Sequence, residues 1–194
     1  MDRLLHWARL TSRTGAWFGG ALVTIAAFII AVDVLMRKLF DTSLGGASEI
    51  SGYVLAVSTT WALALALIDR AHVRIDSLYV LLPARVCAVL DILALLSFMV
   101  FAGFLTWQGW IIFAQSYALD AHSLTPLATP VAIPQFLWVA GFAFFFVVMV
   151  LLLVRALTAL ATGRIDDVRR LLGSRTALQQ LEEALQEHEH YKES

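Results

Sequence analysis

The ionisable residues that could do chemistry lie at the edges of long apolar stretches. Asp33 precedes Arg37 by four residues, a spacing that puts both side chains on one face of a helix, where they can pair. Glu49 opens the next apolar stretch. It could place a negative charge at a helix N-terminus, or it could bridge to Arg37. Charges at these depths indicate structural ion pairs more than a transport path.

A second group of ionisable residues follows the second apolar stretch, in the segment RAHVRID over residues 70–76. We consider the ionisable residues of both groups as candidates for structural ion pairs or for contacts with lipid or a partner subunit. The second group contributes Arg70, His72, Arg74 and Asp76.

Other chemistry is excluded by the residue types and their positions. Ligation of haem between helices needs histidines within the helices, but all five lie in expected tails or loops: His6, His72, His122, His188 and His190. The sequence has no Ser/His/Asp grouping, phosphate loop or metal motif. We therefore expect no enzyme activity, no cofactor, no metal and no catalytic residue. With a net charge of −1, we also expect no nucleic acid partner.

Composition predicts a membrane protein. Of the 194 residues, 60% are hydrophobic and 15% are charged, and the mean hydropathy is +0.78. Soluble domains are typically about 25% charged. Four stretches are long enough to cross a bilayer as helices, at about 15–36, 50–68, 89–113 and 134–154. The fold class expected is an all-α integral membrane protein. The first stretch resembles a signal peptide, but its length and the absence of a clear cleavage site favour an uncleaved span.

The basic residues predict the orientation. Two of the 14, Arg37 and Lys38, fall in the first connection, and none falls between the third and fourth spans. The other 12 lie in the two tails and the second connection. Because basic residues gather on the cytoplasmic side, we expect both termini inside. Trp107, Trp110 and Trp138 would then lie near the outer interface.

The second connection is expected to contain a short amphipathic helix on the cytoplasmic surface. Ile75, Leu78, Tyr79 and Leu82 fall on one helical face, and Pro83 should end or kink the helix. The alternative is that these residues simply begin the third span. In the third connection, the prolines of SLTPLATPVAIP exclude a regular helix. We expect an extended, rigid segment there, with Pro134 in the first turn of the fourth span.

The predicted organisation has three parts. Residues 1–14 form a cytoplasmic N-terminal segment, and residues 15–155 form the four-span membrane domain. Residues 156–194 form a charged cytoplasmic tail of helical pattern. Leu171, Leu178 and Leu185 repeat every seven residues in that tail. Three leucines fall short of a coiled-coil signal, so a solvated helix is the simpler interpretation.

The order of these elements resembles the small membrane subunit (DctQ-like) of tripartite ATP-independent periplasmic, or TRAP, transporters. The resemblance covers roughly residues 15–155. It is carried by Arg37 and Phe40 closing the first span, by Glu49 in SEISGYVLAV, by RAHVRID, and by SLTPLATPVAIPQFLWVAGF. Two features depart from the family: Trp61-Ala-Leu-Ala stands where Phe-Leu-Gly is frequent, and the acidic tail has no counterpart that we can match.

The resemblance implies a non-catalytic scaffold subunit in the bacterial inner membrane. Its partners would be a large (DctM-like) membrane subunit, a periplasmic solute-binding protein and membrane lipids. The large subunit would carry the sodium and substrate sites for uptake of an organic acid or similar solute. Arg37 and Glu49 would fix the outer helix ends, and Arg74 and Asp76 would orient the surface helix. Because the chain stops after the fourth span, we expect it not to be fused to the large subunit.

Two alternatives remain open at this point. The chain could be a membrane anchor or assembly subunit of an unrelated complex, with its tail as the docking element. It could also be a small transporter that works as a homo-oligomer. The absence of charges at mid-span argues against this last alternative.

Overall fold

Four helices account for most of the chain. The computed structural model describes residues 2–69, 82–162 and 171. The helices are α1 (Asp2–Phe40), α2 (Ala47–Ile68), α3 (Ala84–Ala118) and α4 (Ala132–Ala161). Each is long and apolar enough to cross a membrane. The described part of the chain is therefore all-helical, as its composition predicts, apart from one isolated bridge between His122 and Pro130.

The helices extend beyond the predicted spans. α1 has 39 residues, so it is about 58 Å long at 1.5 Å per residue. That length exceeds a hydrocarbon core of about 30 Å. The predicted N-terminal segment is continuous with this helix, since no glycine or proline precedes Gly15 and its leucines and arginines favour helix. α3 likewise starts five residues before the predicted third span and ends five residues after it.

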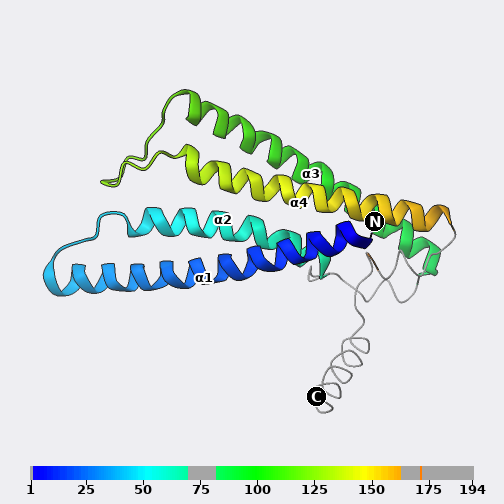
Figure 1. Ribbon diagram of the computed structural model, residues 1–194, viewed down its shortest axis with the longest axis horizontal. Coiled ribbons are helices and arrows are strands. Elements are labelled where there is room, and N and C mark those ends of the chain that lie inside the picture. Colours follow the sequence, from blue (N-terminus) through cyan, green and yellow to red (C-terminus); the bar gives the residue numbers. More distant parts are fainter. Residues whose placement is uncertain (1, 70–81, 163–170, 172–194) are drawn as a thin grey trace, which may run out of the picture.

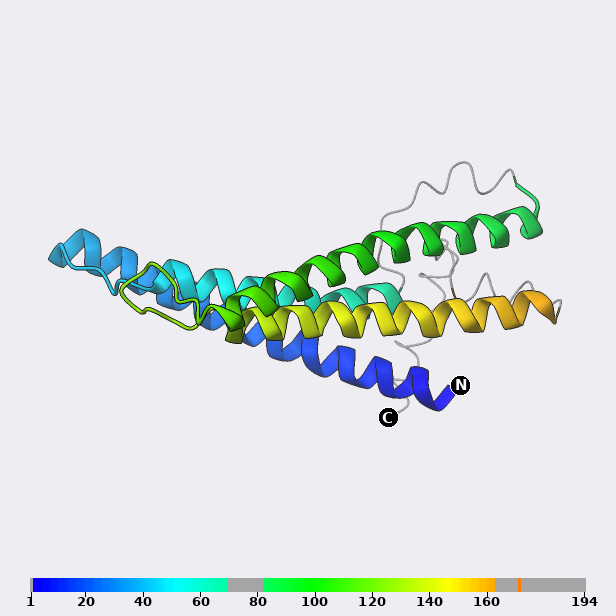
Figure 2. The same ribbon diagram turned by 90° about the horizontal axis from the view of Figure 1, so that it is seen from above.

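The four helices form two hairpins that meet along α2 and α4. α1 packs against α2, α3 packs against α4, and α2 packs against α4. α1 touches α4 only lightly. Figure 2 shows α1 and α3 diverging on either side of α4 toward the end opposite the loops. The order across the molecule is therefore α1, α2, α4, α3, which leaves α1 and α3 as outer helices.

Small residues let the helices approach closely. A Cβ added at Gly19 of α1 would lie 3.0 Å from Ser58 Cβ of α2, and the Ser58 hydroxyl donates to Gly19 O at 3.1 Å. A Cβ added at Gly103 of α3 would lie 3.1 Å from the Phe146 ring of α4. In lipid, apolar burial does not by itself draw helices together, so such close van der Waals packing stabilises the bundle.

The contact between α2 and α4 is the tightest of these. A Cβ added at Gly141 would lie 2.5 Å from Thr60 Oγ1 and 2.9 Å from Trp61 Cδ1. Trp61 stacks on Phe144 with ring centroids 5.7 Å apart, and its Nε1 donates to Leu137 O at 3.1 Å. Trp61 therefore anchors this contact.

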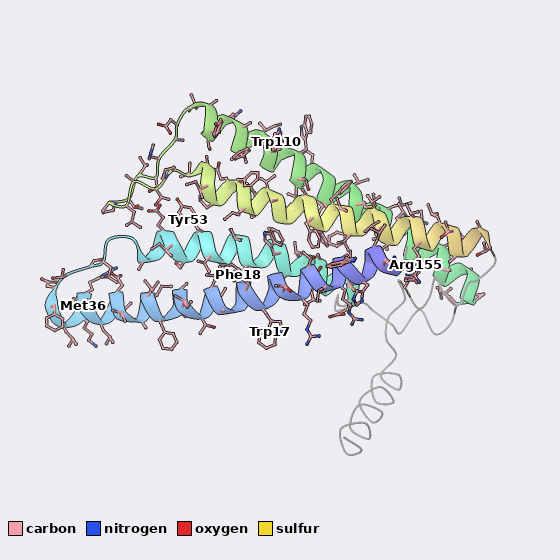
Figure 3. All side chains as sticks on the ribbon, viewed as in Figure 1. Trp17, Phe18, Met36, Tyr53, Trp110 and Arg155 are labelled. Carbon is pink, nitrogen blue, oxygen red and sulfur yellow. The ribbon has the colours of Figure 1, made fainter. Side chains whose placement is uncertain are left out.

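Among the described residues, α4 contributes more buried hydrophobic side chains to the core than any other helix. Phe145, Val148, Met149 and Ala156 are at most 1% exposed. The outer helices instead present large apolar side chains outward, among them Trp17 on α1 and Trp110 on α3, which are 75% and 51% exposed (Figure 3). Faces of this kind must meet lipid or another protein.

The connecting segments differ in how well they follow the sequence predictions. The amphipathic helix predicted around residues 75–82 falls largely outside the described residues. Leu82 and Pro83 do not belong to α3, which begins at Ala84. Pro134 lies in the first turn of α4, as predicted. The segment before it is non-helical, but it is not extended: it folds back on itself, with Val131 N donating to Ala121 O at 3.0 Å.

We predict that Gly141→Ala destabilises the joint between the two hairpins. The new methyl group overlaps Thr60 and Trp61, and overpacking of this kind costs about 1–3 kcal/mol. Thermal unfolding of the purified chain in detergent measures the effect. Gly52→Ala on α2 is the matched control, because an added Cβ there meets nothing within 4 Å. Equal melting temperatures for the two variants would contradict this account of the joint.

Candidate functional site at the loop end

Both described connections lie at one end of the molecule, which we call the loop end (Figure 1). The first joins α1 to α2 over residues 41–46, and the second joins α3 to α4 over residues 119–131. The N-terminus of α1 and the C-terminus of α4 lie toward the opposite end. The loop end contains three of the candidate residues, Asp33, Arg37 and Glu49.

Asp33 organises the first connection. Its side chain is 3% exposed, although the last turns of α1 are otherwise largely exposed. Arg37 donates to Oδ2, in the i,i+4 geometry that the spacing predicts. The Ser43 hydroxyl and the Leu44 amide donate to Oδ1 at 2.9 and 2.6 Å. One carboxylate therefore accepts an arginine, a hydroxyl and a backbone N–H, and it fixes the path of the chain beyond α1.

The turn relies on backbone conformations that few residues adopt. Asp41 has φ of 54° and Gly45 has φ of 73°. Aspartate and glycine are among the residues that tolerate this left-handed region. The Gly45 amide also donates to Ser43 Oγ at 3.1 Å. Ser43 thus links the Asp33 carboxylate to the residues that lead into α2.

Glu49 joins α2 to the second connection. The Thr125 hydroxyl donates to Glu49 Oε2, across 76 residues of sequence. Ser123 Oγ lies 3.0 Å from Thr125 Oγ1, and Tyr53 and Thr129 also lie close to the carboxylate. Glu49 occupies the first turn of α2, as one of its two predicted roles requires. The other predicted role, a bridge to Arg37, is not observed: Arg37 pairs with Asp33 instead.

The two connections also touch directly. A Cβ added at Gly46 would overlap the Leu127 side chain, and one added at Gly45 would lie 3.4 Å from Pro126 Cγ. The second connection is held by its own backbone bonds, including Ser123 N to Thr129 O at 2.9 Å. The loop end is therefore a single polar cap that ties one hairpin to the other.

The four remaining candidates, Arg70, His72, Arg74 and Asp76, lie outside the described residues, and their roles stay predictions. Asp69, directly before them, pairs with Arg9 of α1 at 2.9 Å at the end opposite the loops. Both side chains are substantially exposed, so this pair contributes little to stability. Sequence analysis missed it, and it also missed Ser43 and Thr125. Local spacing does not point to Thr125 and Arg9, which lie 76 and 60 residues from their partners, or to Ser43, which reaches Asp33 only because the chain turns back after α1.

The described residues offer no group of three or more His, Cys, Asp or Glu side chains that could hold a metal ion. Of the buried hydroxyls among the described residues, those of Ser12 and Thr60 bond within their own helices, and that of Ser58 bonds across to α1. Ser12 donates to Ala8 O at 2.7 Å, and Thr60 donates to Val57 O at 2.9 Å. The arrangement is suited to holding helices in place, since its polar groups bond to one another and to the backbone.

We predict that Asp33→Asn loosens the first connection. The substitution removes the ion pair with Arg37 and one charged acceptor, and a loss of this kind costs about 1–3 kcal/mol. Hydrogen exchange should accelerate at the Leu44 and Gly45 amides and leave the core of α4 unchanged. Asp41→Asn is the control: it is an exposed position whose backbone conformation asparagine also tolerates. Faster exchange in both variants alike would refute the role given to Asp33.

Comparison with known proteins agrees with this architecture. The family model for the DctQ component of tripartite ATP-independent periplasmic transporters matches residues 26–159. The match begins within α1 and ends within α4, so it takes in α2, α3 and every residue of the loop-end cap. None of the curated protein sequences compared with the chain matches it. Because the family match covers more than half of the chain, this four-helix membrane protein belongs to the DctQ family of TRAP transporter components.

Proposed function

We propose that this chain is the non-catalytic scaffold subunit of a TRAP transporter. It would pair with a large, DctM-like membrane subunit. That subunit would perform sodium-coupled uptake of an organic acid or similar solute, delivered by a periplasmic binding protein. Membership of the DctQ family supports a role in transport and does not favour an anchor for an unrelated complex. The division of labour between subunits is our inference.

One observation carries the scaffold role: the two central helices, α2 and α4, place no charged side chain between their end regions. The two central helices, α2 and α4, contain one ionisable residue of the Asp, Glu, Lys, Arg or His types each, Glu49 and Arg155. Glu49 belongs to the loop-end cap, and Arg155 lies toward the opposite end (Figure 3). Between them, Trp61, Gly141 and Phe144 fill the contact. Transporters bind polar substrates at mid-membrane sites with broken helices and polar groups.

The contacts that hold the two hairpins together suit a subunit that does not change shape. Glycine contacts within the membrane and a hydrogen-bonded cap at the loop end both resist relative motion of the two hairpins, because close-packed interfaces do not deform continuously. The outward apolar faces of α1 and α3 provide surface for lipid and for the large subunit.

We propose that the loop end faces the periplasm. The distribution of Lys and Arg supports this orientation, because 12 of the 14 would then be cytoplasmic. Leu124 is fully exposed on the second connection, whereas the native Cys87 is 3% exposed. Leu124→Cys should therefore react with a membrane-impermeant thiol reagent on spheroplasts. If the cysteine reacts only after the membrane is permeabilised, the loop end faces the cytoplasm and the proposed orientation is wrong.

We predict that the chain co-purifies with a large multispan membrane protein. The tagged chain is expressed with the products of its neighbouring genes, extracted in mild detergent, and its companions are identified by mass spectrometry. A stoichiometric large membrane protein supports the scaffold role. Transport by the purified chain alone, in liposomes, would instead contradict it.

A further inference from the structure

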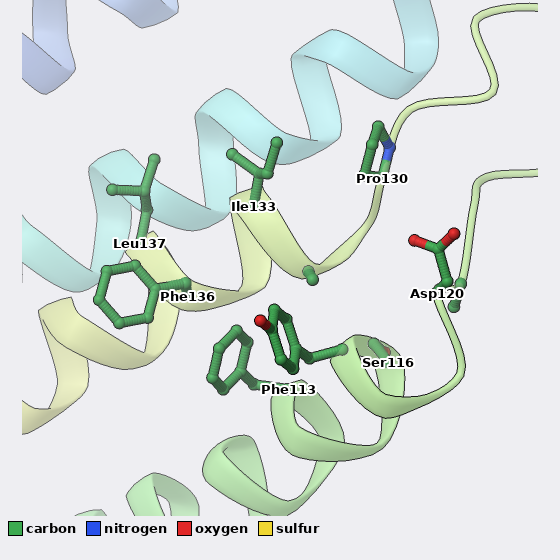
Figure 4. Close-up of a pocket in the computed structure, with 10 residues that line it drawn as sticks. Phe113, Ser116, Asp120, Pro130, Ile133, Phe136 and Leu137 are labelled. Carbon is green, nitrogen blue, oxygen red and sulfur yellow. The ribbon is translucent and has the colours of Figure 1, made fainter.

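A groove opens at the loop end between the last turns of α3 and the first turns of α4 (Figure 4). Its volume is about 670 Å³. That size is within the range of sites that hold a small molecule. Its walls are mainly apolar and come from both helices, with Phe113 on α3 and Ile133, Phe136 and Leu137 on α4. The groove shares part of the second connection with the loop-end cap, but neither Asp33 nor Glu49 lines it.

The rim of the groove is polar and lacks basic residues. The polar residues that line the groove are Asp120, Ser116 and Tyr117. Asp120 stands on the loop side of the opening, across from Pro130 (Figure 4). The sequence has no Lys or Arg between Arg85 and Arg155, so none comes from the segments that form the groove. None of the ion pairs in the described part of the chain involves Asp120.

The groove lies at the ends of two helices that are long and apolar enough to cross a membrane, where the boundary between hydrocarbon and headgroups is expected. Phe113 to Tyr117 and Ala132 to Leu137 lie at the ends of two membrane-spanning helices. Ile133 and Phe136 are 61% and 51% exposed, although they are apolar. Aromatic rings gather here as well: the centroids of Phe113 and Phe136 are 5.5 Å apart. Aromatic side chains are typical of the interface, where an apolar wall meets acyl chains and a polar rim meets headgroups.

We infer that this groove binds one phospholipid whose headgroup ends in a primary ammonium, such as phosphatidylethanolamine. An acyl chain lies on the apolar wall, the ammonium pairs with Asp120, and the hydroxyls of Ser116 and Tyr117 can donate to the phosphate. The charges decide the headgroup class. Phosphatidylglycerol would bring a phosphate and no cation to a rim that offers a carboxylate and no base.

Native mass spectrometry of the delipidated full-length chain tests this inference. Phosphatidylethanolamine and phosphatidylglycerol with identical acyl chains are titrated separately. We expect the first to bind more tightly, and Asp120→Asn to weaken its binding about tenfold, as loss of a charged hydrogen bond does. Asp41→Asn is the matched control. Both aspartates are exposed, lie at the loop end and have positive φ, but only Asp120 lines the groove.

A second pair of variants tests the apolar wall. Ala132→Trp should fill the groove and abolish selective binding, whereas Val147→Trp, at an exposed position of α4 outside the groove, should not. Equal binding of the two lipids, unaffected by Asp120→Asn, would mean an unselective lipid shell and would overturn the inference. A second result would also overturn the inference: Ala132→Trp still binds lipid selectively but no longer co-purifies with the large subunit. The groove would then be a protein interface.

Discussion

The contact between α2 and α4 is the interaction on which the rest of the molecule depends. Each hairpin is closed by its own helix pair. Within the described residues, this contact joins the two hairpins, together with the loop-end cap and a light touch of α1 on α4. It works because Gly141 has no side chain. Trp61 can therefore lie against α4, stack on Phe144 and donate to the backbone at Leu137. In lipid, this packing and hydrogen bonding must replace the hydrophobic force that joins helices in water.

The loop-end cap complements that contact with a different kind of interaction. Asp33 accepts three hydrogen bonds within the first connection, and Glu49 accepts one from Thr125 that joins α2 to the second connection. A carboxylate near the membrane is costly without such partners. Asp33 and Glu49, which the sequence offers as candidate functional residues, thus hold the connections in place. These two sets of contacts, one between the helices and one at the loop end, support the proposed scaffold role.

The sequence predicts this structure well where the signal is local. Hydropathy predicts the four helices, the i,i+4 spacing predicts that Asp33 and Arg37 pair, and proline chemistry predicts where α4 begins. Prediction from the sequence fails where the two partners of an interaction are distant in the chain. Glu49 and Thr125 are 76 residues apart, so charge alone suggested Arg37 as the partner of Glu49. The fold-back of the second connection depends on backbone bonds between residues such as Ser123 and Thr129, and composition does not reveal such bonds. The extension of α1 toward Asp2 lies in polar sequence that hydropathy cannot distinguish from a tail.

The central claim is that this subunit keeps its shape while the transporter works. Double electron–electron resonance tests it most directly, with spin labels on the two outer helices at the exposed positions Phe28 and Val100, in a Cys87→Ser background within the complete transporter. The account predicts one narrow distance distribution that is the same with and without sodium, solute and binding protein. A distribution that shifts or splits when any of them is added would contradict the scaffold role.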